Sequence, residues 1–289
     1  MFIRTGWRKL EKRDTAQQTI RQVARAFQDC ASLRAVVLGG SRATGSATER
    51  SDIDIGLYYD RDEADFAQYN AIAARLDDRR RDGLICTEGG WGRWVNCGGW
   101  LIVNGYAVDI ILRDWQRVQT AVEETDRGIC TCHYQPGHPH AFLNVMYRGE
   151  LACCRVLHAR DEAFFREKRR AESYPPALKK RLVETFLFEA DFSCALAEKC
   201  VASGDAGYLA GQMFRAVSAM HQVLFAFNGT WLLNEKKAAL RAESLPAVPA
   251  GYAGKVNSVF TAAAPITAVT RLRALCGEVS ALAAQGTAT

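Results

Sequence analysis

Residues 38–55 read LGGSRATGSATERSDIDI, and this stretch decides the fold that we expect. The β-branched run just before it, residues 34–38, indicates a short strand that enters a turn of two glycines and a serine. Glycine lets backbone N–H groups come close to phosphate oxygens, and a helix that begins at such a turn adds favourable partial charge. The sequence therefore predicts an anion site, formed by Gly39, Gly40, Ser41 and Arg42.

The end of the same stretch supplies two acids at alternate positions of a second predicted strand, residues 52–59. Asp52 and Asp54 project from one face of this strand, while Ile53 and Ile55 point to the opposite face. Two neighbouring carboxylates repel each other unless a cation lies between them. Mg²⁺ prefers hard oxygen ligands and phosphates, so we expect Mg²⁺ at this pair.

A hairpin further along the chain supplies a third acid. Within residues 100–112, the dipeptide Asn104-Gly105 suits a two-residue type I′ turn between two strands. Asp109 lies opposite the apolar face of the second strand, where an unpaired buried carboxylate would be costly. A metal shared with the first two acids would satisfy it, and two metal ions would clamp the α-phosphate of a nucleotide.

Taken together, the strand, the Gly-Gly-Ser turn, the Asp-x-Asp pair and the later strand aspartate resemble the DNA-polymerase-β-like nucleotidyltransferase superfamily. The resemblance covers roughly residues 30–115. It implies transfer of a nucleotidyl group from a nucleoside triphosphate, with ATP favoured and two Mg²⁺ ions. Asp52, Asp54 and Asp109 are the catalytic and metal-binding residues that it implies.

The second half of the chain resembles small-molecule nucleotidyltransferases of the aminoglycoside and lincosamide resistance type. This resemblance implies a hydroxyl of a small molecule as acceptor, with antibiotics among the candidates. In aminoglycoside adenylyltransferases, a lysine early in a late helix contacts the triphosphate. Lys236 matches that place, and Lys237 is a rival for it.

Two further residues of the helical half are candidates for the site. Glu189 falls in the middle of the apolar face of a helix predicted over residues 175–200, where it is either a general base on the acceptor or the partner of an arginine from another helix. Arg215 belongs to a narrow polar stripe on the next predicted helix, residues 206–227, and either meets phosphate or lies on a solvent-exposed edge.

The pattern of the whole chain predicts an α+β fold. An α/β nucleotidyltransferase domain with a mixed sheet is expected over residues 1–145, followed by an all-helical domain over residues 146–289. A third late helix is expected to begin at an Asn234 cap. Helices are also expected in the first domain, over residues 15–27, 63–79 and 114–124.

Composition limits the classes of function and the compartment. The 289 residues carry a net charge of +5, too small an excess to indicate a nucleic-acid partner by itself. The sequence lacks an apolar run of membrane-spanning length and a signal peptide, and its ten cysteines are typical of reduced thiols, so a cytoplasmic protein is expected. A loop of thiols and imidazoles leaves a zinc site as an alternative, although its spacing fits no common zinc pattern. Its residues are Cys130, Cys132, His133, His138 and His140.

Other interpretations stay open at this stage. The acceptor is either a small molecule or, as in toxin–antitoxin nucleotidyltransferases that resemble this class, a protein or tRNA end. A non-catalytic nucleotide-binding protein is a third hypothesis, although each carboxylate of the motif is present. Trp91, Trp94 and Trp100 either stack on a ligand or belong to the core.

Overall fold

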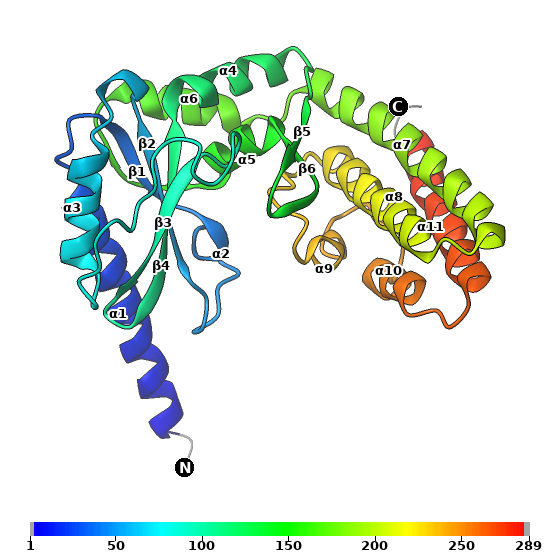
Figure 1. The fold of residues 1–289 in the computed structure, drawn as a ribbon, viewed down its shortest axis with the longest axis horizontal. Coiled ribbons are helices and arrows are strands. Elements are labelled where there is room, and N and C mark those ends of the chain that lie inside the picture. The colour runs from blue at the N-terminus through cyan, green and yellow to red at the C-terminus, as the bar shows by residue number, and fades with distance from the viewer. Residues whose placement is uncertain (1–2, 286–289) are drawn as a thin grey trace. The chain divides into compact units, whose positions relative to one another are not determined.

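The strand that enters the Gly-Gly-Ser turn belongs to a five-stranded sheet (Figure 1). In the computed structural model, which describes residues 3–285, the strand order is β3-β4-β2-β1-β7. The β2 and β4 strands run parallel, and the other neighbouring pairs of this sheet are antiparallel. The expected mixed sheet is therefore confirmed. The strands are β1 (Leu33–Leu38), β2 (Ile53–Tyr59), β3 (Cys97–Val103), β4 (Tyr106–Asp114) and β7 (Arg155–Ala159).

One face of the sheet is covered by α1 (Ile3–Phe27) and α3 (Phe66–Leu76), with a short 3-10 helix at Arg61–Glu63 before α3. The core between these helices and the sheet is largely apolar, and each large side chain buried there contributes about 1.5–3 kcal/mol. It includes Ile20, Val23 and Phe27 of α1, Tyr69 and Ile72 of α3, and Ile53, Ile55, Val108 and Ile110 of the strands.

The opposite face is covered at only one end. The Tyr58 ring packs edge-on against Trp115 and Phe164, with centroids 6.0 and 5.2 Å away. Nearby, Arg113 pairs with Glu150. These partners come from α4 (Trp115–Asp126), α5 (Val145–Cys153) and α6 (Glu162–Glu172). Since side chains alternate along β2, Asp54 lies on the same face as Tyr58, at the end that these helices leave half-exposed.

The chain passes three times between two compact units. The first comprises residues 1–122 and 147–173, and the second comprises residues 123–146 and 174–289. Two of the crossings lie inside helices, α4 and α5, and the third follows the end of α6. This division differs from the one expected, at residue 145. One reason is that β7 returns to pair with β1, in a region where the sequence indicated helices. The other is that the hairpin of β5 (Cys132–Gln135) and β6 (His138–Leu143) belongs to the second unit.

The second unit is otherwise helical, as expected. Its central pair is α7 (Pro176–Ser203) and α8 (Ala206–Phe227), joined by Gly204 in a left-handed conformation. The predicted helix at 206–227 is confirmed. The predicted start of the third helix is wrong: Asn234 accepts a hydrogen bond from Lys236 N, but this closes a turn, and α9 (Ala238–Ala242) begins later. The unit ends with α10 (Tyr252–Phe260) and α11 (Pro265–Gln285). Within residues 3–285, no helix combines the length and apolarity needed to cross a membrane.

Candidate active site

Two acids of the motif, Asp54 and Asp109, are direct neighbours in the sheet. The parallel register of β2 and β4 places them opposite each other, so they project from the same face. Both are half-buried, whereas Ile53 and Ile55 are fully buried in the core on the other side. Asp52 precedes β2 and is exposed. The structure thus brings Asp54 and Asp109 together on the face away from α1 and α3, with Asp52 at its edge.

The electrostatics of this pair favour a bound cation. Burial raises the pKa of Asp109, and the negative charges of Asp54 and then Asp52 raise it further, to about 6. A divalent cation would relieve that repulsion. Among residues 3–285, no three His, Cys, Asp or Glu side chains already lie together as a metal site. Mg²⁺, however, is commonly held by one or two carboxylates together with substrate phosphates. The Asp54–Asp109 pair fits such an ion.

The Gly-Gly-Ser turn lies directly against this pair. Gly39 N donates a 2.8 Å hydrogen bond to Asp54 O, which joins the turn to β2. Gly40 has a φ of +56°, and a Cβ at this position would overlap the Asp54 carboxylate. Only glycine therefore allows the backbone to approach the acid so closely. The turn opens the four-residue helix α2 (Gly40–Ala43), in which Ser41 is half-buried.

Arg42 forms hydrogen bonds to the segment that carries Asp52. Its guanidinium donates hydrogen bonds to Ser51 O (2.6 Å) and Asp52 O (3.0 Å) and lies 5.8 Å from the centre of the Tyr106 ring. The phosphate-binding role expected for Arg42 stays a prediction. In the structure, the guanidinium ties the loop after α2 to the start of β2.

Three predicted site residues, Glu189, Arg215 and Lys236, lie in the second unit. The Glu189 carboxylate accepts a 2.8 Å hydrogen bond from His140 Nε2 of β6 and pairs with Arg215 Nε at 2.9 Å. The sequence left two roles open for Glu189, general base or partner of an arginine from another helix. The structure contains the pairing with an arginine. Periodicity could place Glu189 on a buried face but could not identify His140, which reaches it from a hairpin 49 residues away.

Lys236 is exposed, in the turn that precedes α9. Its neighbour Glu235 is mostly buried and lies 3.2 Å from His138 of β6. Lys237 has a left-handed backbone, with a φ of 60°. The structure therefore places Lys236 in the exposed turn just before α9 and Lys237 at the N-cap of this helix.

The loop of thiols and imidazoles does not gather into one cluster of ligands. His138 and His140 each pair with a glutamate, and His133 bonds to Thr131. Within the described residues 3–285, none of these side chains belongs to a group of three that would hold a metal ion. The sequence could not show these pairings, because each glutamate comes from a distant part of the chain.

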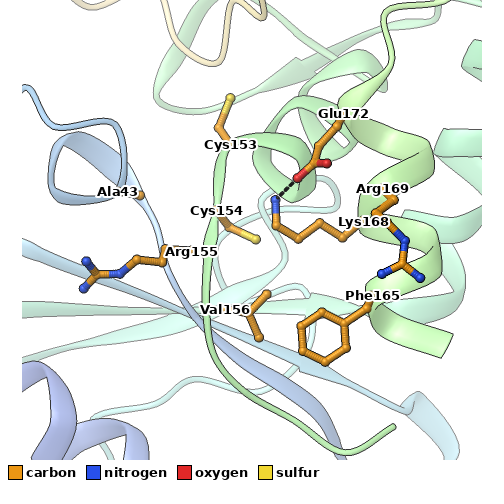
Figure 2. A pocket seen from close by; sticks show the side chains of 9 residues that line it. All are labelled: Ala43, Cys153, Cys154, Arg155, Val156, Phe165, Lys168, Arg169 and Glu172. Atoms are coloured by element: carbon orange, nitrogen blue, oxygen red, sulfur yellow. Dashed lines mark hydrogen bonds and ion pairs between the residues drawn. The ribbon is translucent and has the colours of Figure 1, made fainter. Parts of the chain in front are cut away.

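A separate hollow of about 380 Å³ opens beside α2 in the first unit (Figure 2). Its wall includes Ala43, the last residue of α2, together with residues 153–156 and four residues of α6. Figure 2 shows Lys168 extended towards Glu172, with which it forms a 2.7 Å ion pair. Lys168 also donates to Ala152 O at 2.8 Å. The lining residues include none of the predicted site residues, and the lysine charge is already paired.

Comparison with known protein families finds a match in the first unit. The family described as polymerase beta, nucleotidyltransferase, matches residues 21–85. A solved structure of a nucleotidyltransferase-like protein from Exiguobacterium sibiricum 255-15 is similar to this chain, with 8% identity and a TM-score of 0.45, over 93% of this chain and 75% of that one. No curated protein sequence matches the chain.

The family match includes the features that build the site. Residues 21–85 run from the end of α1 through β1, the Gly-Gly-Ser turn and the strand that follows Asp52, and they stop before Asp109. Proteins of this family generally use a nucleoside triphosphate and a divalent metal ion. The match identifies a polymerase-β-type nucleotidyltransferase domain at residues 21–85, and it supports a nucleotidyltransferase activity for the chain.

Proposed function

We propose that this nucleotidyltransferase transfers a nucleoside monophosphate from a nucleoside triphosphate to a hydroxyl group of a small molecule. AMP is the monophosphate that we expect. Pyrophosphate is the second product. The observation that supports the proposal is the Asp54–Asp109 pair, packed against a glycine turn whose backbone is held to Asp54. Antibiotics that carry hydroxyl groups are candidate acceptors.

The first unit supplies the phosphate and metal contacts. The backbone N–H group of Gly40 and the Ser41 hydroxyl bind the β- and γ-phosphates, while Gly39, whose N–H donates to Asp54 O, holds the turn against the acid pair. Asp52 and Asp54 would hold Mg²⁺ together with the triphosphate, and the ion would supply positive charge for the departing pyrophosphate. Asp109 completes the carboxylate set from the side away from the turn.

In the transfer step, the acceptor hydroxyl gives its proton to the Asp109 carboxylate. The hydroxyl oxygen forms a bond to the α-phosphorus while the bond from that phosphorus to the bridging oxygen breaks, and pyrophosphate leaves with both electrons of the broken bond. A base is most effective when its pKa lies near the working pH. Burial is the largest cause of the raised pKa of Asp109, and this cause does not depend on the neighbouring charges that a bound Mg²⁺ would offset.

In the second unit, the triphosphate-binding role of Lys236 stays a prediction from the sequence, and its side chain is exposed in the turn before α9. Arg215 is half-exposed and shares its charge with Glu189, which sets the direction of the guanidinium. In this proposal, Glu189 positions Arg215 and His140 and does not act as the base.

The test is transfer of a labelled nucleotide. Each of the four α-³²P triphosphates is incubated with Mg²⁺ and with a panel of aminoglycosides, lincosamides, tRNA and cell lysate, and pyrophosphate release is followed in parallel. We expect label on a small molecule, with ATP as the best donor. Label on tRNA or on protein would contradict the acceptor class. Full activity of Asp54→Asn or Asp109→Asn would contradict the site.

A further inference from the structure

An exposed tryptophan stands in the same row of the sheet as the two acids. The antiparallel register of β3 and β4 places Trp100 opposite Asp109, and the parallel register of β2 and β4 places Asp54 on the other side of Asp109. The Gly39 N–H bonds to Asp54 O at the end of the row. The order across this face is therefore the phosphate-binding turn, Asp54, Asp109 and Trp100.

The order of these groups across the sheet matters for the geometry of the transfer step. In phosphoryl and nucleotidyl transfer, the attacking and leaving oxygens lie roughly in line on opposite sides of the phosphorus. If the turn at Gly39 and Gly40 holds the leaving pyrophosphate, the attacking hydroxyl must approach from the opposite side of the acid pair. Trp100 is the large side chain on that side, and it is 60% exposed.

Trp100 is held as a flat and rigid surface. The Trp91 ring stacks on it, with centroids 4.5 Å apart and an interplanar angle of 25°. Gly98 leaves room for this stack, since a Cβ there would overlap the Trp91 ring. Arg81 Nη2 donates to Trp100 O at 3.2 Å, which fixes the strand edge. One face of the Trp100 indole is thus covered by Trp91.

The loop that carries Trp91 is also fixed by hydrogen bonds. Asn96 O accepts from Trp91 N at 2.9 Å, and Asn96 Oδ1 accepts from Gly89 N at 3.1 Å. Asn96 Nδ2 donates to Tyr59 OH, which donates to Glu88. A large aromatic surface that is exposed, rigid and beside a catalytic acid marks a binding site for an apolar face of a ligand.

We infer that the Trp100 indole, backed by Trp91, is the surface on which a ring-bearing acceptor alcohol lies, with its hydroxyl directed at Asp109. The inference deepens the proposed function and rests on it. A ring with an apolar face, from a saccharide, a cyclitol or an aromatic alcohol, covers an indole well, whereas an open-chain polyol covers it poorly.

Binding is tested first without turnover. The chain has six tryptophans, so a ¹⁵N spectrum contains six indole N–H signals, and Trp100→Phe identifies one of them. The protein is saturated with Mg²⁺ and α,β-methylene-ATP and then titrated with methyl glucoside, streptamine, tyrosinamide or sorbitol. We expect a saturable shift of the Trp100 signal with at least one ring compound and none with sorbitol. The compound that shifts it distinguishes a saccharide or cyclitol from an aromatic alcohol.

Three outcomes of this titration would overturn the inference: no ring compound moves the Trp100 signal, sorbitol moves it equally, or the nucleotide alone moves it to saturation. In the last case, the base would lie on the indole. A normal Trp100 shift without pyrophosphate release from any acceptor would count against the proposed reaction and leave the binding surface in place.

Kinetics supply the second test, with an acceptor that the transfer assay finds active. We expect Trp100→Ala to raise the KM for the acceptor about tenfold, or about 1.4 kcal/mol, and to leave the KM for the triphosphate within about twofold. Trp100→Phe should retain most of the affinity. Phe192→Ala is the matched control, because Phe192 is 54% exposed and stacks on Phe188 in the other unit. An unchanged acceptor KM in a folded Trp100→Ala protein would refute the inference.

Discussion

The acids of the predicted site have opposite surroundings in the two units of this chain. In the first unit, Asp54 and Asp109 are adjacent in register, and their mutual repulsion helps to raise the pKa of Asp109 to about 6. In the second unit, Glu189 is bound by His140 and Arg215. An acid that already has cationic and hydrogen-bonding partners gains little from a metal ion, whereas two adjacent acids gain much.

The same contrast exists inside the first unit. Asp77 is completely buried at the end of α3, where it accepts hydrogen bonds from Arg81 and from Ile102 N. These bonds lower the pKa of Asp77, while Asp109 on the same sheet has a raised pKa. The direction of the pKa shift therefore separates an acid that stabilises the fold from an acid that is placed for chemistry.

The largest expected effect comes from neutralising the acid pair. Asp109→Asn should lower kcat/KM for transfer on the order of 10³-fold, the usual scale for loss of a general base. The same change removes a like charge, so without Mg²⁺ its Tm should be about 1–2 °C above that of the wild type, the shift that roughly 0.5 kcal/mol produces. Differential scanning calorimetry and the transfer assay measure the two effects. A lower Tm would show that Asp54 and Asp109 do not repel each other.

Asp77→Ala should have the opposite effects: a lower stability and an almost unchanged activity. We expect a loss of about 3 kcal/mol in the free energy of unfolding, since Arg81 and Ile102 N lose a buried partner, while kcat stays near the wild-type value. The pKa of Asp77 is lower in the folded chain than in the unfolded chain. Its contribution is thus complete above the unfolded pKa of about 4 and is lost as the pH falls below it. Urea unfolding between pH 3 and 7 measures this, with Asp77→Asn as the control. A constant difference across that range would contradict the ion pair.

Gly40→Ala tests the contact between the turn and the acid pair. The new Cβ would displace the Asp54 carboxylate, so kcat/KM should fall about 10²-fold, as a displacement of about 1 Å is known to cause. Gly45→Ala is the matched control. Gly45 also has a positive φ, of +77°, but no atom lies within 4 Å of the position that its Cβ would take. Equal losses in the two variants would mean that backbone strain is the cause and the contact with Asp54 is not.

The sequence predicted those features of the site that depend on local pattern. The Gly-Gly-Ser turn, the alternation in β2 and the Asn104-Gly105 turn all follow from neighbouring residues, and both turn residues have the positive φ expected. The partners that come from distant segments could not be predicted. His140 reaches Glu189 from a hairpin 49 residues away, and β7 reaches β1 across more than a hundred residues. Periodicity shows which face a side chain occupies, but it does not show what covers that face.

Glu189→Gln gives the smallest effect and decides which acid takes the proton. The amide keeps a hydrogen bond to Arg215 but loses the charge, and Arg215 is more than half exposed to solvent, so the free energy of unfolding should fall by only about 1 kcal/mol. We expect kcat/KM to stay within about tenfold of the wild type, because Glu189 orients Arg215 and does not touch the acceptor. Glu198→Gln is the control, since Glu198 is also on α7 and pairs with an arginine, Arg273. If Glu189→Gln instead loses as much activity as Asp109→Asn while Glu198→Gln loses none, the base is Glu189. A paired acid would then perform the chemistry, and the contrast between the two units would no longer identify the catalytic one.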